Sequence, residues 1–480
     1  NTHPIILACI AAYIVVIVVA GIYLTRKKVK NSDDFAVANR SLPTIVLIGT
    51  LLATWCGAGG ITGSANMVWQ NGPLFGILIF IGAPVGMILL YLVSGKVRQA
   101  TTYTIPELFE LRYGTTARAI ATVCIVLGYI GILASQFMAA GNIVNLVTGI
   151  DIKTATIICG ILIVILAVTG GMVSVAYTDA MSAFLIVGGF LVAIPMLSGQ
   201  IDGGFFGMFA SLPEGKNTFS GNLNVIQAIG YVFPIFFLVL GDQNMIQRIG
   251  AAKDVKTAKR SGKGLVVAEV LVCALIIITV TTGIFLIPEM DNPDTVIFQL
   301  AIGFLPPLIA GLLLSGCMAF VITTGDSYVL SIASNITYDI WGRFINKNAD
   351  DKQKLRFLRI SAFAVAIVAY VLGEFFPDIL SVQMYAYSMY GASITPALVC
   401  ALFSKNVTKA GGLAGILGGG ISTIIWEVVL KSPFGIKSAI ITVPFSFALI
   451  FIVSYFTKNG SKVALEEVYV KKADLYESKR

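Results

Sequence analysis

Apolar segments long enough to cross a lipid bilayer recur along the whole chain, with no soluble domain between them. A spanning helix needs about 20 mostly apolar residues, and the bilayer core offers no water to unpaired backbone groups, so such segments are helical. The sequence therefore predicts an all-α integral membrane protein with about thirteen transmembrane helices, at 4–25, 43–69, 74–95, 118–147, 154–171, 178–198, 223–243, 263–287, 305–337, 358–376, 379–403, 410–430 and 436–456.

Composition agrees with that prediction. Of the 480 residues, 57% are hydrophobic and 12% charged, whereas soluble domains are about 25% charged. A soluble globular protein is excluded. The formal net charge of +8 could suggest a nucleic-acid partner, but basic residues also fix the orientation of membrane helices. We attribute the charge to membrane topology and expect no nucleic-acid partner.

The distribution of Lys and Arg predicts that orientation. If the loop at 26–40 is cytoplasmic, alternation of the helices places 29 of the 33 basic residues inside. Only Lys153, Lys216, Lys431 and Lys437 then lie outside. We expect a multi-pass protein of the plasma membrane with its N-terminus outside and its C-terminus in the cytoplasm.

Cysteine and histidine usage excludes several kinds of site. The seven cysteines lie one per apolar segment without a C-x-x-C pair, so neither a disulfide framework nor a metal cluster is indicated. His3 is the single histidine, which leaves no Ser/His or Cys/His dyad for hydrolysis. We expect a protein that is not an enzyme.

Glycine and proline interrupt two of the predicted helices. Gly57, Gly59, Gly60 and Gly63 fall within seven positions of the second span, and the seventh span contains Gly230 to Pro234 and ends at Gly241–Asp242. Interrupted helices at corresponding positions of two halves are typical of inverted repeats with a binding site at the membrane midplane. Close helix packing through small residues is the alternative.

Polar residues inside the ninth span suggest a cation site. Thr323, Asp326 and Ser327 lie at i, i+3 and i+4 and therefore share one helix face. Hydroxyls, a carboxylate and carbonyls freed by a helix break form an all-oxygen set suited to a hard cation such as sodium. Alternatively, the hydroxyls bond their own helix. Asp179, near the start of the sixth span, could also act only as a helix N-terminal anion.

Several other residues are candidate walls of a substrate pocket. Trp55 lies beside the glycines, and an aromatic face can bind a cation. Asp242 either belongs to the site or pairs with Arg248. The sequence leaves Glu269 and Glu427 without an assigned role.

The same regions carry motifs of a known family: Asp34-Phe-Ala-Val-Ala-Asn-Arg-Ser-Leu-Pro43, Thr104-Ile-Pro-Glu-Leu-Phe-Glu-Leu-Arg-Tyr-Gly114, Gly170 to Asp179, Gln243 to Arg248, the Thr323 region, and Tyr390-Gly-Ala-Ser-Ile-Thr-Pro-Ala-Leu398. With these motifs the chain resembles the sodium:solute symporter family over almost its whole length. The resemblance implies a LeuT-type core of two inverted five-helix repeats. It implies a peripheral helix and basic loop at 1–42, repeats at 43–198 and 223–403, an external loop at 199–222, two peripheral helices at 404–456 and a cytoplasmic tail at 457–480.

The resemblance also implies the binding residues. A main sodium site would use the carbonyls of Ala53, Cys56 and Phe320 and the hydroxyls of Thr323 and Thr324. A second sodium position would use Asp179, Asp326 and Ser327, although family members have Ser where this chain has Asp326. Motifs around Trp55 look closest to the choline-transporter branch. The candidate substrate-binding residues are Trp55, Gly57, Ala58, Thr62, Gln136, Phe237, Asp242 and Tyr390.

These observations predict a sodium-coupled symporter that takes up a small organic solute by alternating access. The solute is expected to be a cationic or zwitterionic amine, choline-like or an amino acid. The alternatives are a proton-coupled permease, a sodium-coupled monocarboxylate or sugar transporter, and a passive channel. Sodium, the solute and the bilayer are the expected partners of a monomeric protein.

Overall fold

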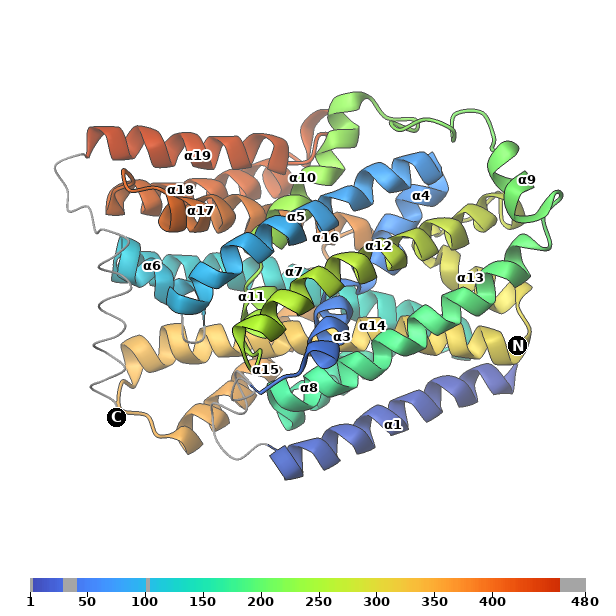
Figure 1. Cartoon of the computed structure of the whole chain (residues 1–480), viewed down its shortest axis with the longest axis horizontal. Coiled ribbons are helices and arrows are strands. Elements are labelled where there is room, and N and C mark those ends of the chain that lie inside the picture. The colour runs from blue at the N-terminus through green and yellow to red at the C-terminus, as the bar shows by residue number, and fades with distance from the viewer. Residues whose placement is uncertain (1–2, 29–40, 101–103, 458–480) are drawn as a thin grey trace.

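The structure is a computed structural model that describes residues 3–28, 41–100 and 104–457. Residues 29–40 of the predicted basic loop and residues 458–480 of the predicted tail lie outside the described residues. Within them the chain is helical, and its long helices run side by side (Figure 1). Eleven helices are long and apolar enough to cross a membrane, or twelve when a bent pair counts as one span. The all-helical membrane fold is therefore confirmed.

The first half of the chain contains the peripheral first helix and the first interrupted span. Its elements are α1 (Pro4–Lys28), α3 (Thr44–Trp55), η2 (Gly59–Ser64), α4 (Ala65–Asn71), α5 (Pro73–Ala100), α6 (Ile105–Tyr113), α7 (Thr115–Thr148), α8 (Ile152–Ser198) and α9 (Gly204–Ala210).

The second half repeats an interrupted span and ends in two peripheral helices. Its elements are α10 (Val225–Gly241), α11 (Gln243–Gly250), α12 (Val255–Leu286), η3 (Pro293–Thr295), α13 (Val296–Phe304), α14 (Pro307–Ser334), η4 (Asn335–Ile345), α15 (Asp351–Gly373), α16 (Ile379–Ser393), α17 (Thr395–Phe403), α18 (Lys409–Ile424), η5 (Ile425–Val429), η6 (Pro433–Gly435) and α19 (Ala439–Phe456).

The predicted count of thirteen differs from eleven or twelve because α8 contains both the fifth and the sixth predicted spans. Its 47 residues would extend about 70 Å as one straight helix, more than twice the hydrocarbon thickness. Gly171 interrupts α8 with a φ of 58°, a left-handed conformation that glycine adopts without steric cost. Gly171 therefore makes the turn between the two predicted spans 154–171 and 178–198, where the sequence suggested a short loop.

The centre of the bundle is formed by α14 and α16, whose residues are mostly buried, whereas α1, α15, α18 and α19 lie at the periphery. Small residues bring α14 and α3 close to α8. A side chain at Gly316 would lie 2.8 Å from the Cα of Ile186, and one at Gly49 would lie 2.5 Å from the Cα of Ala180. Close backbone approach of this kind is how membrane helices pack without a hydrophobic driving force.

A short backbone contact joins the two interrupted spans. Leu42, just before α3, donates its amide to the carbonyl of Ala251 at 3.1 Å and accepts from the amide of Lys253 at 3.3 Å, just after α11. The segment before α3 and the segment after α11 thus form an isolated parallel bridge.

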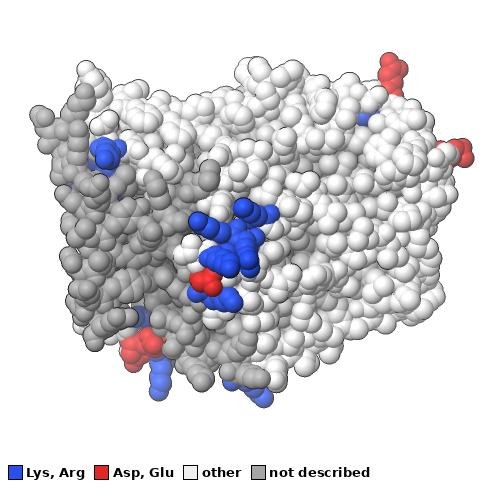
Figure 2. Space-filling view, viewed as in Figure 1, with Lys and Arg blue, Asp and Glu red and all other residues white. Residues whose placement is uncertain are grey.

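Figure 2 shows one face of the molecule, with Lys and Arg side chains gathered in its middle and at its left, acidic side chains among them, and further acidic side chains toward the right end, beside a small basic patch. In the same view α1 begins at the right and α19 ends at the left (Figure 1).

Candidate functional site

The first interrupted span bends by 56° between Trp55 and Gly59. Gly57 lies at the bend because no side chain fits there: a Cβ would be 2.5 Å from both the Gln136 Oε1 and the Thr324 Oγ1. Gln136 of α7 accepts a hydrogen bond from the Ala58 amide at 2.9 Å, and the Thr62 hydroxyl donates to the Ala58 carbonyl. Side chains therefore satisfy backbone groups that the break sets free.

Oxygen atoms from α3 and α14 converge beside this bend. The Ala53 carbonyl accepts from the Thr324 hydroxyl at 2.8 Å and from the Thr323 hydroxyl at 3.4 Å, and Thr323 also reaches the Phe320 carbonyl at 3.3 Å. All of these residues are buried, and Cys56 follows at the break. The structure thus brings four of the five predicted main-site residues together, namely Ala53, Phe320, Thr323 and Thr324, and their all-oxygen chemistry fits a hard monovalent cation.

A second polar cluster lies one turn further along α14. The Thr50 hydroxyl donates to Asp179 Oδ2 at 2.6 Å, and the Arg248 guanidinium lies 3.8 Å from the same carboxylate. Arg248 also donates to the Ser327 hydroxyl, and Ser327 donates to Asp326 Oδ1 at 3.3 Å. Asp179 Oδ1 has no hydrogen-bond partner among the described residues. Arg248 thus pairs with Asp179 directly and is linked to Asp326 through the Ser327 hydroxyl.

The second interrupted span breaks at Asp242, between α10 and α11, where the sequence predicted that the span ends; the predicted interruption at Gly230–Pro234 is wrong, because α10 continues unbroken through Pro234. A proline has no N–H for the backbone carbonyl four residues before it, but neighbouring helices can supply a donor to that carbonyl. The helix therefore need not break at Pro234. The Asp242 carboxylate accepts from the hydroxyls of Tyr129 and Tyr328 and from the Asn244 amide.

Tyr390 lies against the same break. Its hydroxyl donates to the Gly241 carbonyl at 2.9 Å and accepts from the Gln243 amide at 3.1 Å, while its ring stacks on Tyr129 at 4.9 Å. Phe237 does not join this group: its side chain packs on Ala392, near α19. The candidate substrate residues thus fall around two breaks, with Phe237 elsewhere.

Two residues near the first break carried no clear sequence signal. Glu269 of α12 accepts from the Trp55 indole at 3.0 Å. Gln383 of α16 is 1% exposed, and neither its Oε1 nor its Nε2 has a partner among the described residues. A Cβ on Gly63 would collide with the Gln383 amide. Both contacts cross long stretches of sequence, so only the fold reveals them.

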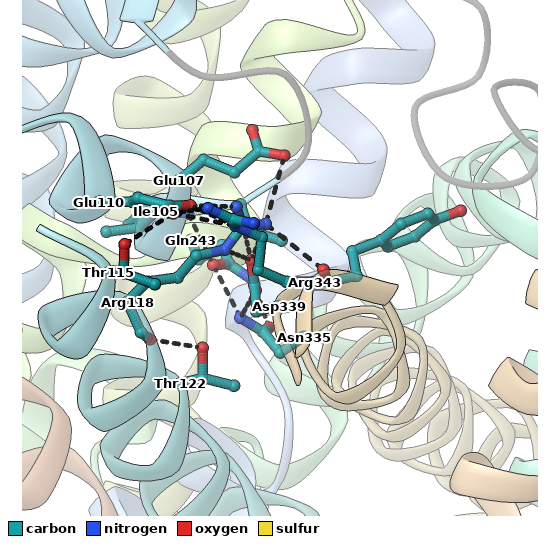
Figure 3. Close-up of polar contacts among 12 residues, drawn as sticks. Ile105, Glu107, Glu110, Thr115, Arg118, Thr122, Gln243, Asn335, Asp339 and Arg343 are labelled. Atoms are coloured by element: carbon teal, nitrogen blue, oxygen red, sulfur yellow. Dashed lines mark hydrogen bonds and ion pairs between the residues drawn. The ribbon is translucent and has the colours of Figure 1, made fainter. Parts of the chain in front are cut away.

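A polar network closes one end of α7. Figure 3 shows the Arg118 guanidinium between acidic groups of α6 and η4, which bind it at 2.6 Å (Glu110) and 2.8 Å (Asp339). Arg343 also binds Glu110 at 2.6 Å. Burial alone would raise the pKa of the Glu110 carboxyl, but the two guanidiniums together hold that pKa below its usual value. The Oε1 of Gln243, on α11, accepts a hydrogen bond from the Ile105 amide at 2.9 Å.

The opposite end of α7 borders a cavity of about 540 Å³. Asn66 of α4, Phe137 of α7, Asp294 of η3 and Ile379 of α16 are among its lining residues. The Asp294 carboxylate accepts from the Asn66 amide at 2.7 Å and from the Ile379 backbone amide at 3.0 Å, and burial raises its pKa. One end of the bundle is thus hollow and the other is closed by ion pairs.

Comparison with known proteins identifies the family. The sequence profile of the sodium:solute symporter family matches residues 35–419. The chain belongs to the sodium:solute symporter family. Its relatives are transporters and not enzymes. The chain is therefore a multi-pass membrane symporter, and the family indicates sodium as its coupling ion.

Relatives of this symporter include bacterial proline transporters. The high-affinity proline transporter PutP of Bacillus subtilis is 27% identical over 93% of this chain and 97% of that protein. A sodium/proline symporter of Staphylococcus aureus is 25% identical over 94% of this chain and 92% of that protein.

Two solved structures share the symporter's fold. A Na⁺-coupled sialic acid symporter in a substrate-bound outward-open state has a TM-score of 0.82 at 17% identity, covering 96% of this chain and 99% of the other. Mhp1, a nucleobase-cation-symport-1 family transporter, has a TM-score of 0.61 at 11% identity, covering 93% and 99%. At these identities the likeness establishes the LeuT-type fold alone.

Proposed function

We propose that this symporter couples inward sodium flow to the uptake of a small zwitterionic or cationic amine by alternating access. The observation that carries the proposal is the contact of the Thr323 and Thr324 hydroxyls with the Ala53 carbonyl. It joins α14 to the last turn of α3, directly before the bend. A sodium ion bound between these oxygens would hold the two helices together and so favour one conformation by differential binding.

The solute class is supported by the residues at the bend and by the relatives. Trp55 offers an aromatic face, and its ring stacks on Tyr387 at 6.3 Å. The wall of the substrate pocket is formed by the other candidate residues except Phe237, namely Gly57, Ala58, Thr62, Gln136, Asp242 and Tyr390. Because the relatives are named as proline transporters, an amino acid such as proline is the first candidate, ahead of a choline-like cation.

A second sodium ion is proposed at Asp179, Asp326 and Ser327. Two carboxylates share the single positive charge of Arg248, so the cluster is one cation short of neutrality when both are ionised. Burying an uncompensated charge is costly, and a bound monovalent cation would remove that cost.

The organisation of the chain follows from the same proposal. The repeats at 43–198 and 223–403 each begin with a broken helix, and the closed end of α7 is the cytoplasmic end. The N-terminus is outside, the C-terminus is inside, and the protein works as a monomer in the plasma membrane.

Reconstituted transport tests the coupling ion. Purified protein in liposomes should accumulate labelled L-proline under an inward sodium gradient and should not do so without sodium, whatever the pH gradient. A proton-coupled permease would instead accumulate solute in sodium-free buffer under a proton gradient and lose that response in Asp179→Asn. Robust sodium-free accumulation by the unmodified protein would refute the proposal.

A further inference from the structure

Glu269 is a carboxylate buried in the helix bundle without a positively charged partner. It is 1% exposed, on α12. No ion pair joins it to a Lys, Arg or His in the part of the chain that the structure describes. Asp179 and Asp339, in contrast, each have an arginine, at 3.8 Å and 2.8 Å. Glu269 therefore needs a different source of compensation.

Two of its three protein donors are weak. The Trp55 indole donates to Oε1 at 3.0 Å, and the thiols of Cys273 and Cys56 approach Oε1 at 3.3 Å and Oε2 at 3.6 Å. Thiols are poor donors, and a carboxylate offers about four lone-pair positions. A buried ionised carboxylate without a cation is strongly disfavoured, so Glu269 can carry its negative charge only with a positive charge beside it.

Glu269 lies at the bend of the first interrupted span. Trp55 is the last residue of α3 and Cys56 is the first residue of the break, so the carboxylate touches the point where the helix bends. Of the residues from 49 to 68, only Trp55 and Gly60 are partly exposed. A side chain on Gly60 would point toward Ile276 of α12, at 3.4 Å. The accessible part of the break thus faces the helix that carries Glu269.

An aromatic surface completes the arrangement. The Trp55 indole donates to Glu269 while its ring stacks with Tyr387 at an angle of 27°. A carboxylate held at the edge of an aromatic ring, next to the π face of that ring, is a combination that attracts an ammonium group, by charge and by cation–π interaction. The Asp242 carboxylate is less available to a ligand, because two tyrosine hydroxyls and the amide of Asn244 already donate hydrogen bonds to it.

We propose that Glu269 is the counter-charge for the positively charged amine of the transported solute, with Trp55 orienting its carboxylate. The inference rests on the proposed function, because it assigns one chemical group of the amine substrate to one residue. Ala53, which takes part in the sodium site, lies two residues before Trp55. Sodium binding would therefore also position the indole that holds Glu269.

Ligand-induced stabilisation of the purified full-length protein tests the assignment, because a ligand that binds only the native state raises its melting temperature. The probes are L-proline, pyrrolidine, which has the amine but no carboxylate, and cyclopentanecarboxylate, which has no nitrogen. In sodium buffer, the unmodified protein should respond to L-proline, more weakly to pyrrolidine, and not to cyclopentanecarboxylate. Glu269→Gln should raise the Kd for L-proline at least tenfold and abolish the pyrrolidine response.

Stabilisation by sodium alone serves as the folding control and should be unchanged in Glu269→Gln. Glu427→Gln is the matched control, since Glu427 lies in the peripheral η5 and accepts from the Ser438 amide at 2.8 Å; it should bind all probes as the unmodified protein does. If Glu269→Gln does not fold, Glu269→Asp, which keeps the charge, should retain the preference for pyrrolidine over cyclopentanecarboxylate.

Two different results would overturn different claims. Binding of L-proline by Glu269→Gln within twofold of the unmodified protein, or loss of the amine preference in a folded Glu269→Asp, refutes the role of Glu269 and leaves the amine substrate intact. An unmodified protein that responds to sodium but to none of the amines refutes the proposed substrate class, and the role of Glu269 with it.

Discussion

The Thr324 hydroxyl lies 2.8 Å from the carbonyl oxygen of Ala53, although 271 positions separate them in the sequence. The contact crosses from the second half of the chain to the first, at the last turn before a helix bends. An ion bound between these two oxygen atoms would link the two halves of the chain directly.

Removing the hydroxyl should weaken sodium binding. We expect Thr324→Ala to raise the sodium concentration for half-maximal uptake by tenfold or more, on the order of 1.4 kcal/mol, because the site loses one oxygen donor. Sodium titration of uptake in proteoliposomes measures this. Thr169→Ala is the control, since the Thr169 hydroxyl bonds only its own helix, at 2.7 Å from the Ile165 carbonyl. Equal sodium dependence of the two variants would contradict the proposed site.

The bend at Gly57 should not tolerate a methyl group. A Cβ there would be 2.5 Å from both the Gln136 Oε1 and the Thr324 Oγ1, so Gly57→Ala must displace both side chains. We expect a lower melting temperature and loss of the sodium-induced increase in stability. Gly188→Ala on α8, where a Cβ would meet nothing within 4 Å, is the matched control and should behave as the unmodified protein. A sodium response retained in Gly57→Ala would show that the bend is not part of the site.

Membrane orientation can be tested by labelling. In a background without reactive thiols, Lys256→Cys and Lys352→Cys should resist an impermeant maleimide added to intact cells, because both positions are predicted to face the cytoplasm. Lys431→Cys, predicted to be outside, should react. The reverse pattern would invert the topology.

The Glu110 ion pairs should make stability depend on pH. Because the pKa of this carboxyl is lower in the folded protein than its usual value of about 4.3, its pairing with arginine adds stability above that value. The contribution is lost as the pH falls through the lower, folded pKa. We therefore expect the melting-temperature advantage of the unmodified protein over Glu110→Gln to be constant between pH 6 and 7 and to shrink as the pH falls below about 4.3. A constant advantage down to pH 3 would mean that the ion pairs do not contribute.

The sequence predicted those parts of the site that depend on local chemistry. Glycines close together indicated the bend at Gly57, and the spacing of Thr323 and Ser327 put their hydroxyls on one helix face. The structure adds the contacts made between helices, such as Trp55 to Glu269 and Arg118 to Asp339. Those pairs are 214 and 221 positions apart, and no periodicity in the sequence predicts which buried carboxylate meets which donor.

One sequence expectation was wrong, and one candidate residue lies apart from the others, for physical reasons that a single sequence does not reveal. Pro234 resembles a helix breaker, yet α10 passes through it because neighbouring helices surround that turn. Phe237 is apolar on a helix with apolar surroundings on several sides, so its direction depends on where α16 and α19 pack.

The bridge between Leu42 and the segment just after α11 allows one step of the transport cycle to be followed by hydrogen–deuterium exchange of backbone amides. Two backbone hydrogen bonds tie the start of one broken helix to the end of the other, so neither half-helix can swing away alone without breaking them. The amides of Leu42 and Lys253 would exchange with deuterium only when both half-helices separate. Their exchange rates would therefore measure how often that end of the protein opens, without the need for a labelled solute. Because one separation exposes both amides, which lie about 210 positions apart in the sequence, the two rates should change together.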